Sequence, residues 1–146
     1  MYEEWLEKMR RWCSLRERCT WDVEQKLRPH ISDKTTVNQI VESLSKEDFL
    51  SDDRFLASYV RTHAEHKSWG PRKIVQGLRA KGFSGTRAQQ AVANFPESTF
   101  QEILAHLIQR RKEDLANNRE KVIRFLASRG FSVNDILRGI EEADGR

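Results

Sequence analysis

The sequence of 146 residues contains little cysteine, proline or glycine, with 2, 3 and 7 residues of each. Cys13 and Cys19 are too few for a disulfide framework, and we expect packing rather than redox roles for them. No apolar run reaches the roughly 18 to 20 residues of a membrane span, and acids open the N-terminus. We therefore expect a folded cytoplasmic protein with no membrane partner.

Acidic residues are missing from one segment. None lies between Glu65 and Glu97, whereas six basic residues do: Lys67, Arg72, Lys73, Arg79, Lys81 and Arg87. Residues 49–97 carry 8 basic against 4 acidic residues, residues 1–48 carry 9 against 10, and residues 98–146 carry 9 against 8. The net charge of +4 therefore resides in the middle third. This distribution predicts a positive surface for an anionic partner.

Catalytic motifs are also missing. There is no glycine-rich phosphate loop, H-E-x-x-H, deaminase signature or G-x-S-x-G elbow. His63 and His66 have a metal-like i, i+3 spacing, but without further ligands we interpret them as exposed polar residues. Asp52 and Asp53 are better explained as first-turn acids of a helix than as a catalytic pair. We expect no cofactor, no metal and no enzymatic activity. An enzyme with dispersed catalytic residues is the alternative, which a pocket with perturbed carboxylates would support.

The apolar spacing is helical almost throughout, with no strand-like alternation. It predicts helices around residues 5–13, 20–27, 36–44, 51–60, 71–80, 84–95, 100–117, 122–129 and 132–140. Ser51, Ser84 and Ser132 are expected N-caps, and Pro71 fits a first helical position. Pro29 and Pro96 should end helices. The last apolar stripe consists of Val133, Ile136, Leu137 and Ile140.

Two segments of the chain repeat each other. Arg72-Lys73-Ile74 through Lys81-Gly82-Phe83-Ser84 aligns with Glu120-Lys121-Val122 through Arg129-Gly130-Phe131-Ser132, 48 residues later. This period predicts an all-α protein of three tandem three-helix repeats, at 1–48, 49–97 and 98–146, forming an elongated, curved body. Bodies of this kind usually bind other macromolecules.

The basic residues of the middle third give the best positive signal. Ile74, Val75 and Leu78 define a buried face, so Arg72 and Arg79 must point to solvent or to a partner. Six cations would extend the positive field into the last third: Arg110, Arg111, Lys112, Lys121, Arg124 and Arg129. A solvated basic face is the alternative interpretation.

Aromatic residues offer a second kind of contact. Trp5, Trp12 and Trp21 could stack on nucleic-acid bases, but their helical spacing favours core positions. Trp69, directly before Gly70-Pro71, fits the core less well and is a candidate contact anchor.

Several motifs resemble the RecX regulatory proteins of bacteria. They are Phe49-Leu50-Ser51-Asp52-Asp53-Arg54-Phe55, Trp69-Gly70-Pro71-Arg72-Lys73-Ile74, Leu78-Arg79-Ala80-Lys81-Gly82-Phe83-Ser84 and Arg129-Gly130-Phe131-Ser132. The resemblance covers nearly the whole chain and is most specific in the middle block. The chain departs from the family at Asp48, where glycine is frequent, and at Cys19, where a capping serine is common.

The resemblance implies a monomer that binds the RecA recombinase filament on single-stranded DNA. It implies inhibition of filament growth, ATP hydrolysis, strand exchange and RecA-assisted repressor cleavage. Within the matched block it points to Arg72, Lys73, Arg79 and Lys81 as contacts, with Arg54 as a structural or contact residue. A basic helical module that binds DNA directly is the alternative, and a steep salt dependence on bare DNA would reveal it.

Overall fold

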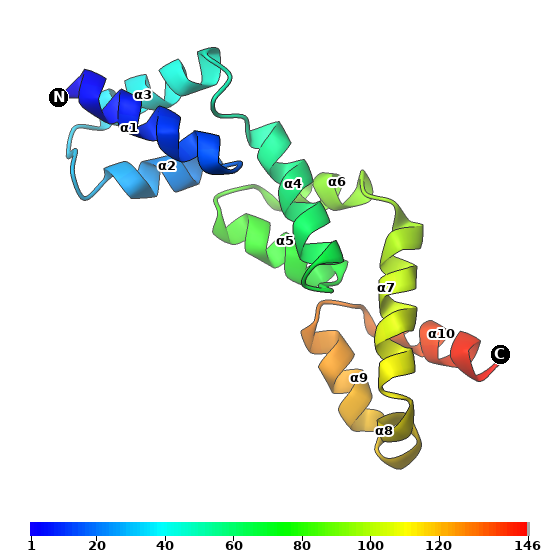
Figure 1. Ribbon diagram of the computed structural model, residues 1–146. Coiled ribbons are helices and arrows are strands. Elements are labelled where there is room, and N and C mark those ends of the chain that lie inside the picture. The colour runs from blue at the N-terminus through cyan, green and yellow to red at the C-terminus, as the bar shows by residue number, and fades with distance from the viewer. Residues whose placement is uncertain (146) are drawn as a thin grey trace. The chain divides into compact units, whose positions relative to one another are not determined.

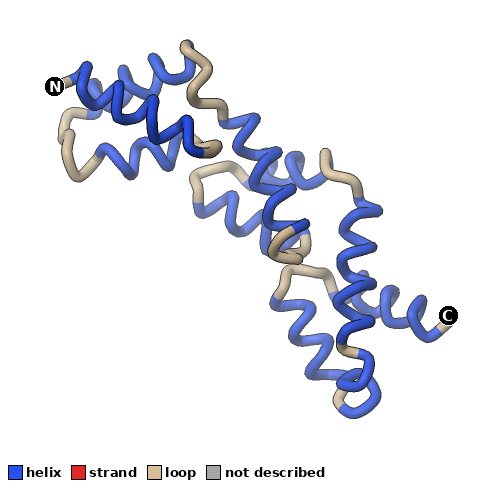
Figure 2. The backbone as a smooth tube through the Cα atoms, in the orientation of Figure 1, coloured by secondary structure: helices blue, strands red, loops and turns tan. Residues whose placement is uncertain are grey.

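The computed structural model describes residues 1–145, and within this range the chain has helices and loops but no strand (Figure 2). The helices are labelled in Figure 1: α1 (Tyr2–Leu15), α2 (Thr20–Leu27), α3 (Lys34–Lys46), α4 (Asp52–Glu65), α5 (Pro71–Ala80), α6 (Gly85–Ala93), α7 (Glu97–Arg110), α8 (Lys112–Asn117), α9 (Arg119–Ser128) and α10 (Val133–Asp144). The predicted all-α class is confirmed. No helix in the described range is long and apolar enough to cross a membrane. Arg146, at the end of the third predicted repeat, lies outside that range.

Side-chain caps begin several of these helices. The hydroxyls of Ser84 and Ser132 accept hydrogen bonds from backbone N–H groups at 3.1 Å, and Ser51 does so at 3.2 Å, so the three predicted N-caps are confirmed. The expected start of α3 near Thr36 is two residues too late. The Asp33 carboxylate accepts hydrogen bonds from the Thr35 N–H and the Thr36 hydroxyl, and this cap lets the helix begin at Lys34.

The chain divides into two compact units, residues 1–58 and residues 59–146. In the first unit α3 packs against both α1 and α2 (Figure 1). Its buried core consists of Leu6, Met9, Cys13, Val23, Leu27, Ile31, Val37, Ile40, Leu44 and Leu50. Trp5 and Trp12 are partly buried against this core, as their helical spacing predicts.

In the second unit α5 packs on α6, and α10 packs on α7 and α9 (Figure 1). A core cluster holds the last three of these helices together: Leu104, Leu107, Ile108, Val122, Leu126, Phe131, Ile136 and Ile140. Burial of these apolar side chains supplies most of the driving force for packing. Val133 and Leu137, expected in the same stripe, are instead 48% and 39% exposed. Only the Ile136 and Ile140 side of α10 faces the core, because a helix of this period buries a single stripe.

The two repeated segments have the same local structure. Gly82 and Gly130 follow their helices with φ of 91° and 104°, a left-handed conformation that glycine adopts without strain. The next residue, Phe83 or Phe131, donates its N–H to Leu78 or Leu126 at 3.3 Å in both cases. The two repeated segments therefore end their helices with the same backbone conformation and the same hydrogen bond. The division into three repeats at the predicted boundaries stays a prediction.

The long helix expected over residues 100–117 is two helices. α7 ends at Arg110 and α8 begins at Lys112, with Arg111 between them at φ −112° and ψ 23°. The apolar stripe of α7 stops at Ile108, and in the following nine residues Leu115 alone packs against the core. Without a continuous buried face, nothing holds these residues on the axis of α7.

Candidate partner-binding site

The loop between α4 and α5 is shaped by a stack of rings. His63 lies against Tyr59, with ring centroids 3.7 Å apart, and Trp69 packs on the same histidine at 4.6 Å. His63 Nδ1 is 2.8 Å from the Tyr59 carbonyl oxygen. The histidine is half-buried rather than exposed as the sequence suggested, because the loop returns over it, and burial lowers its pKa below the ordinary 6.5. His66 is exposed as expected.

Two glycines lock this loop to the end of α9. The Gly70 N–H donates to the Arg129 carbonyl at 2.7 Å, and the Arg72 N–H donates to the Gly130 carbonyl at 2.9 Å. A Cβ on Gly70 would lie 2.6 Å from the Gly130 carbonyl carbon, and one on Gly130 would lie 2.6 Å from the Lys73 Cβ. Only glycine permits this backbone approach at either position. The contact fixes the start of α5 beside α9.

The lock produces an open depression of about 740 Å³ in the second unit. Its lining comes from the loop after α4, from α5, from the end of α7 and from α9: His66, Lys67, Ser68, Trp69, Lys73, Leu107, Arg110, Arg111, Phe125 and Arg129. Half of these residues are cations, and none of the described lining residues is acidic. A concave site lined by one sign of charge concentrates anions.

Aromatic rings hold several of these cations in place. The Arg111 guanidinium carbon lies 3.6 Å from the centroid of Phe125, and Lys73 Nζ lies 4.6 Å from that of Trp69. The Arg129 guanidinium donates a hydrogen bond to the Lys67 carbonyl oxygen. Contacts of this kind position a cation without neutralising it. Within the described chain, the five cations of the depression form no ion pair with a carboxylate.

Two buried nitrogen atoms of the depression lack hydrogen-bond partners. Within residues 1–145, Nε of Arg111 and Nε of Arg129 are buried and have no hydrogen-bond partner. A buried donor left unpaired costs roughly 1–3 kcal/mol, so such atoms are rare unless water or a ligand satisfies them. Both belong to residues that line the same depression.

The structure brings together part of the predicted contact set. Five of those residues line the depression: Trp69, Lys73, Arg110, Arg111 and Arg129. The others do not line it. Arg72 and Arg79 are exposed on α5 opposite the buried Ile74 and Leu78, as predicted. The rest of the set outside the depression consists of Lys81, Lys112, Lys121, Arg124 and Arg54.

Sequence reasoning missed Lys67 and Phe125 as site residues. Lys67 could have been found, because it lies in the acid-free segment with the other cations. Phe125 belongs to an apolar stripe, and its ring is only partly buried against the core. Its contact with Arg111 has no signal in the sequence, because it depends on how α7 ends beside α9.

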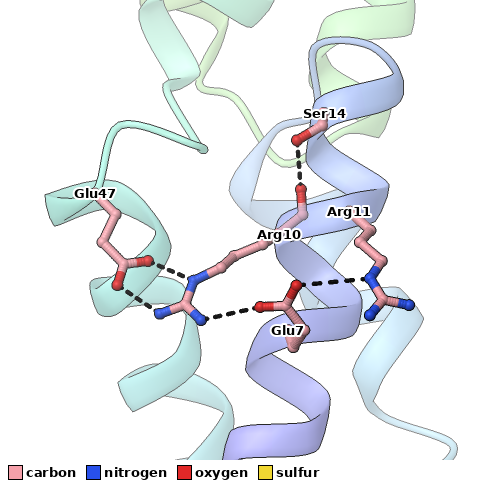
Figure 3. Close-up of polar contacts among 5 residues, drawn as sticks. All are labelled: Glu7, Arg10, Arg11, Ser14 and Glu47. Carbon is pink, nitrogen blue, oxygen red and sulfur yellow. Dashed lines mark hydrogen bonds and ion pairs between the residues drawn. The ribbon is translucent and has the colours of Figure 1, made fainter.

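Two arginines of the first unit are paired with carboxylates, in contrast to the cations of the depression. Arg10 donates to both carboxylate oxygens of Glu47, at 2.8 and 2.6 Å, and also to Glu7 (Figure 3). Arg54 donates to Glu17 at 3.0 Å and to Asp48 at 2.7 Å, which raises its pKa above the ordinary value. These bonds join segments 37 residues apart, so these two arginines stabilise the fold of the first unit. The role of Arg54 as a partner contact stays a prediction.

Asp52 and the two cysteines also have structural positions. Asp52, in the first turn of α4, accepts hydrogen bonds from the Thr20 N–H at 2.8 Å and the Thr20 hydroxyl at 3.1 Å. It therefore caps α2 as well as beginning its own helix. Cys13 and Cys19 are both buried, and burial raises the pKa of the Cys13 thiol. Across residues 1–145 no three His, Cys, Asp or Glu side chains group as metal ligands would.

The fold and the site together define an all-helical protein with a cationic depression in its second unit. Residues 51–92 match the model of a domain described as "RecX, second three-helix domain". The relative Regulatory protein RecX of Bacillus subtilis is 26% identical over 136 residues, which cover 90% of this chain and 52% of that protein. The same-named protein of Oceanobacillus iheyensis is 25% identical, covering 90% and 50%. The chain thus spans about half the length of the curated relatives it matches.

Solved structures agree with this assignment. The crystal structure of RecX from Lactobacillus salivarius superimposes with a TM-score of 0.85 at 25% identity, covering 99% of this chain and 97% of that one. A second structure, of regulatory protein RecX, gives 0.79 at 25% identity, covering 92% and 68%. The chain is similar in sequence and in fold to RecX proteins, and the resemblance suggested by its motifs is confirmed.

Proposed function

We propose that this chain binds the RecA filament on single-stranded DNA and restrains its growth. Inhibition of ATP hydrolysis, strand exchange and RecA-assisted repressor cleavage follows, because each of these activities requires an assembled filament. The chain catalyses no reaction itself in this proposal, and it acts in the cytoplasm as a monomer. Similarity in sequence and fold to regulatory proteins named RecX supports the proposal.

One observation carries the proposal further than the family name. The cations that line the depression are aligned by rings and backbone contacts but are not paired with carboxylates, whereas the first unit includes two arginines in bidentate or double ion pairs. Unpaired cations held in place are suited to an anionic partner, because the cost of ordering them is met within the fold. A filament assembled on DNA is such a partner.

Arg72 and Arg79 are the contacts to test first. Both are exposed on α5, away from the depression, on a helix whose other side is fully buried at Ile74 and Leu78. Their replacement should change stability by no more than about 0.5 kcal/mol, because neither supports the core. Reversing both charges should weaken filament binding strongly and mainly slow association.

The experiment compares R72E/R79E with the equally charged control R11E/K46E. Arg11 and Lys46 are 78% and 75% exposed in the first unit and pair only with neighbours on their own helices. The readouts are binding to RecA filaments and the DNA-dependent ATPase of RecA at moderate salt. We expect inhibition to be lost in the first variant and kept in the control. Normal inhibition by R72E/R79E would show that this face of α5 is not the contact surface.

Direct DNA binding is the second candidate function, and the cationic depression favours it. The two candidates differ in salt dependence. A module that binds bare DNA loses affinity steeply with salt, whereas a filament contact that includes apolar or hydrogen-bonded surface should lose less. Equal affinity for bare DNA and filament, with an unchanged ATPase, would support the DNA-binding module.

A further inference from the structure

The second unit has another concave feature, on the helices α7 and α10, which pack on each other (Figure 1). It is a slot of about 90 Å³. Its lining residues recur at helical spacing on both helices, and the chain at Pro71 and Phe131 completes it: Glu97, Phe100, Gln101, Leu104, Ala105, Asp135, Arg138, Gly139 and Glu142. None of these residues lines the cationic depression, so the slot is a separate surface that the proposed function does not use.

The size of the slot limits what it can take. Sites for cofactors and metabolites usually have volumes of about 300–1,000 Å³, well above that of the slot. A volume of about 90 Å³ equals that of about three water molecules at roughly 30 Å³ each, and a branched side chain has a similar size. Phe100, Leu104 and Phe131 are buried and give the slot an apolar wall. An aliphatic side chain placed against them would leave water, which favours binding.

The charged residues of the slot are mostly acidic. Glu97 lies on α7, and Asp135 and Glu142 lie on α10. Arg138 is the single cation among the described lining residues, and its guanidinium lies 3.6 Å from the Asp135 carboxylate. Glu97 and Glu142 are exposed and form no ion pair within residues 1–145. Each helix therefore contributes one unpaired negative charge beside an apolar slot.

Charge complementarity defines the flanks of the occupant. A segment that inserts an aliphatic side chain brings its neighbouring residues close to Glu97 and Glu142. Acidic neighbours, or the phosphates of a nucleic acid, would place like charges together and lose affinity. Lysine or arginine on either side of the inserted residue would be attracted instead. The slot thus has the opposite charge preference to the cationic depression.

A second copy of this chain matches this chemistry less well. Its candidate for insertion is Leu15, at the end of α1, which is 77% exposed. Arg11, one turn earlier, is already paired with Glu7 at 3.6 Å, and Glu17 follows two residues after Leu15. The flanks of Leu15 are therefore mixed in charge rather than basic. A foreign segment with basic flanks fits the two unpaired carboxylates better.

We propose that the slot between α7 and α10 binds a basic segment of a partner protein by taking one aliphatic side chain of that segment. The inserted side chain supplies most of the affinity, because pairs between exposed charges contribute little on their own. Glu97 and Glu142 select segments with lysine or arginine around the inserted residue. The inference goes beyond the proposed function and does not rest on it, because the slot and the depression share no lining residue.

The test titrates the isotope-labelled full chain with short blocked peptides and follows its amide signals by nuclear magnetic resonance. The probe is Lys-Lys-Leu-Lys-Lys. Lys-Lys-Ala-Lys-Lys keeps the charge but lacks the aliphatic side chain, and Glu-Glu-Leu-Glu-Glu keeps that side chain but reverses the charge. We expect the probe to shift signals of residues 97–105 and 135–142 saturably. The alanine peptide should bind about tenfold more weakly, and the acidic peptide should leave these signals in place.

A filled slot is the first variant to compare. Ala105→Leu extends a side chain into the slot from α7, whereas Ala127→Leu adds the same side chain at an exposed position of α9. Gly139 is left unchanged, because a Cβ there would lie 2.8 Å from the Ile108 Cδ1 and disturb the packing of α10 on α7. We expect Ala105→Leu to bind the probe about tenfold more weakly and Ala127→Leu to bind it like the natural chain.

Removal of charge is the second comparison. E97Q/E142Q removes the two unpaired carboxylates of the slot. E102Q/E141Q removes two exposed carboxylates of the same helices that do not line it. We expect the first variant to bind the probe about threefold more weakly, with less dependence on salt, and the second to bind it like the natural chain.

Four results would overturn the proposal. Equal binding of the leucine and alanine peptides would show adventitious attraction of a polycation only, and equal binding of the acidic peptide would show that charge does not select the occupant. Unchanged binding by Ala105→Leu, with the natural fold shown by circular dichroism, would place the probe elsewhere. A dimer of the chain alone in sedimentation, abolished by Ala105→Leu, would assign the slot to a second copy. RecA enters none of these readouts, so failure here leaves the proposed function untouched.

Discussion

Residues 1–58 and residues 59–145 both contain many basic side chains, but the two units use them differently. In the first unit Arg10 and Arg54 each bind two carboxylates and join segments distant in the chain. In the second unit the segments are joined by the Gly70 and Gly130 backbones, and five cations remain unpaired around a depression. Where backbone contacts supply the lock, charged side chains are free for a partner. The pairing of charges therefore separates structural cations from candidate contacts better than their number does.

The largest expected effect comes from breaking the lock of the second unit. Gly130→Ala places a Cβ 2.6 Å from Lys73 Cβ and backbone N, at a φ of 104° that alanine rarely adopts. We expect the free energy of unfolding to fall by about 3 kcal/mol or more. Urea denaturation followed by circular dichroism measures this loss. Gly85→Ala is the control, because its Cβ would meet only the Arg79 side chain at 3.9 Å and stability should be unchanged or higher.

A smaller loss is expected from the first unit. Asp52→Ala removes the acceptor for the N–H and hydroxyl of Thr20, at the start of α2. The expected cost is about 1–2 kcal/mol, typical of a lost cap with an unpaired donor. Asp52→Asn keeps one acceptor oxygen and should recover part of the loss. Equal stability of Asp52→Ala and the natural chain in thermal unfolding would show that this cap is dispensable.

These contacts show which parts of the fold are readable in the sequence. Serine caps, proline stops and apolar stripes are local, and they predicted the helix class and the serine-capped helix starts correctly. The break at Arg111 and the burial of His63 depend on what packs from elsewhere in the chain, so a local pattern could not reveal them. The site, too, has one part that local sequence patterns predict and another that depends on distant packing. The acid-free segment indicated the cations, but their convergence depends on the approach of Gly70 to Gly130.

The His63 stack gives a pH dependence that belongs to the second unit. Burial lowers the pKa of His63, so the unfolded chain binds its proton more tightly than the folded chain does. The stability contributed by neutral His63 is complete above the ordinary pKa of 6.5 and declines as the pH falls below it. We expect the urea concentration at the midpoint of unfolding to decrease as the pH is lowered from about 7.5 to about 5.5. His63→Gln should flatten this change, whereas replacing the exposed His66 should leave it in place.

The smallest effect is expected at the Arg10–Glu47 pair. The hydrogen bond from Arg10 is the main cause that lowers the pKa of Glu47, so this carboxylate stabilises the fold above its ordinary pKa of 4.5 and loses that contribution as the pH falls. Glu47→Gln should therefore be slightly less stable than the natural chain at neutral pH and equal to it at strongly acidic pH. High salt should reduce the difference. A difference that is independent of both pH and salt would exclude an electrostatic origin.

The most direct test of the contrast between the units is amide hydrogen exchange of the natural chain with and without RecA filaments on single-stranded DNA. We expect the filament to slow exchange in residues 66–73, 107–112 and 125–130, which carry or flank the unpaired cations. Exchange in residues 3–15 and 40–48, where Arg10 and Glu47 are paired, should stay unchanged. Protection concentrated in residues 1–58, with the second unit unaffected, would contradict the account.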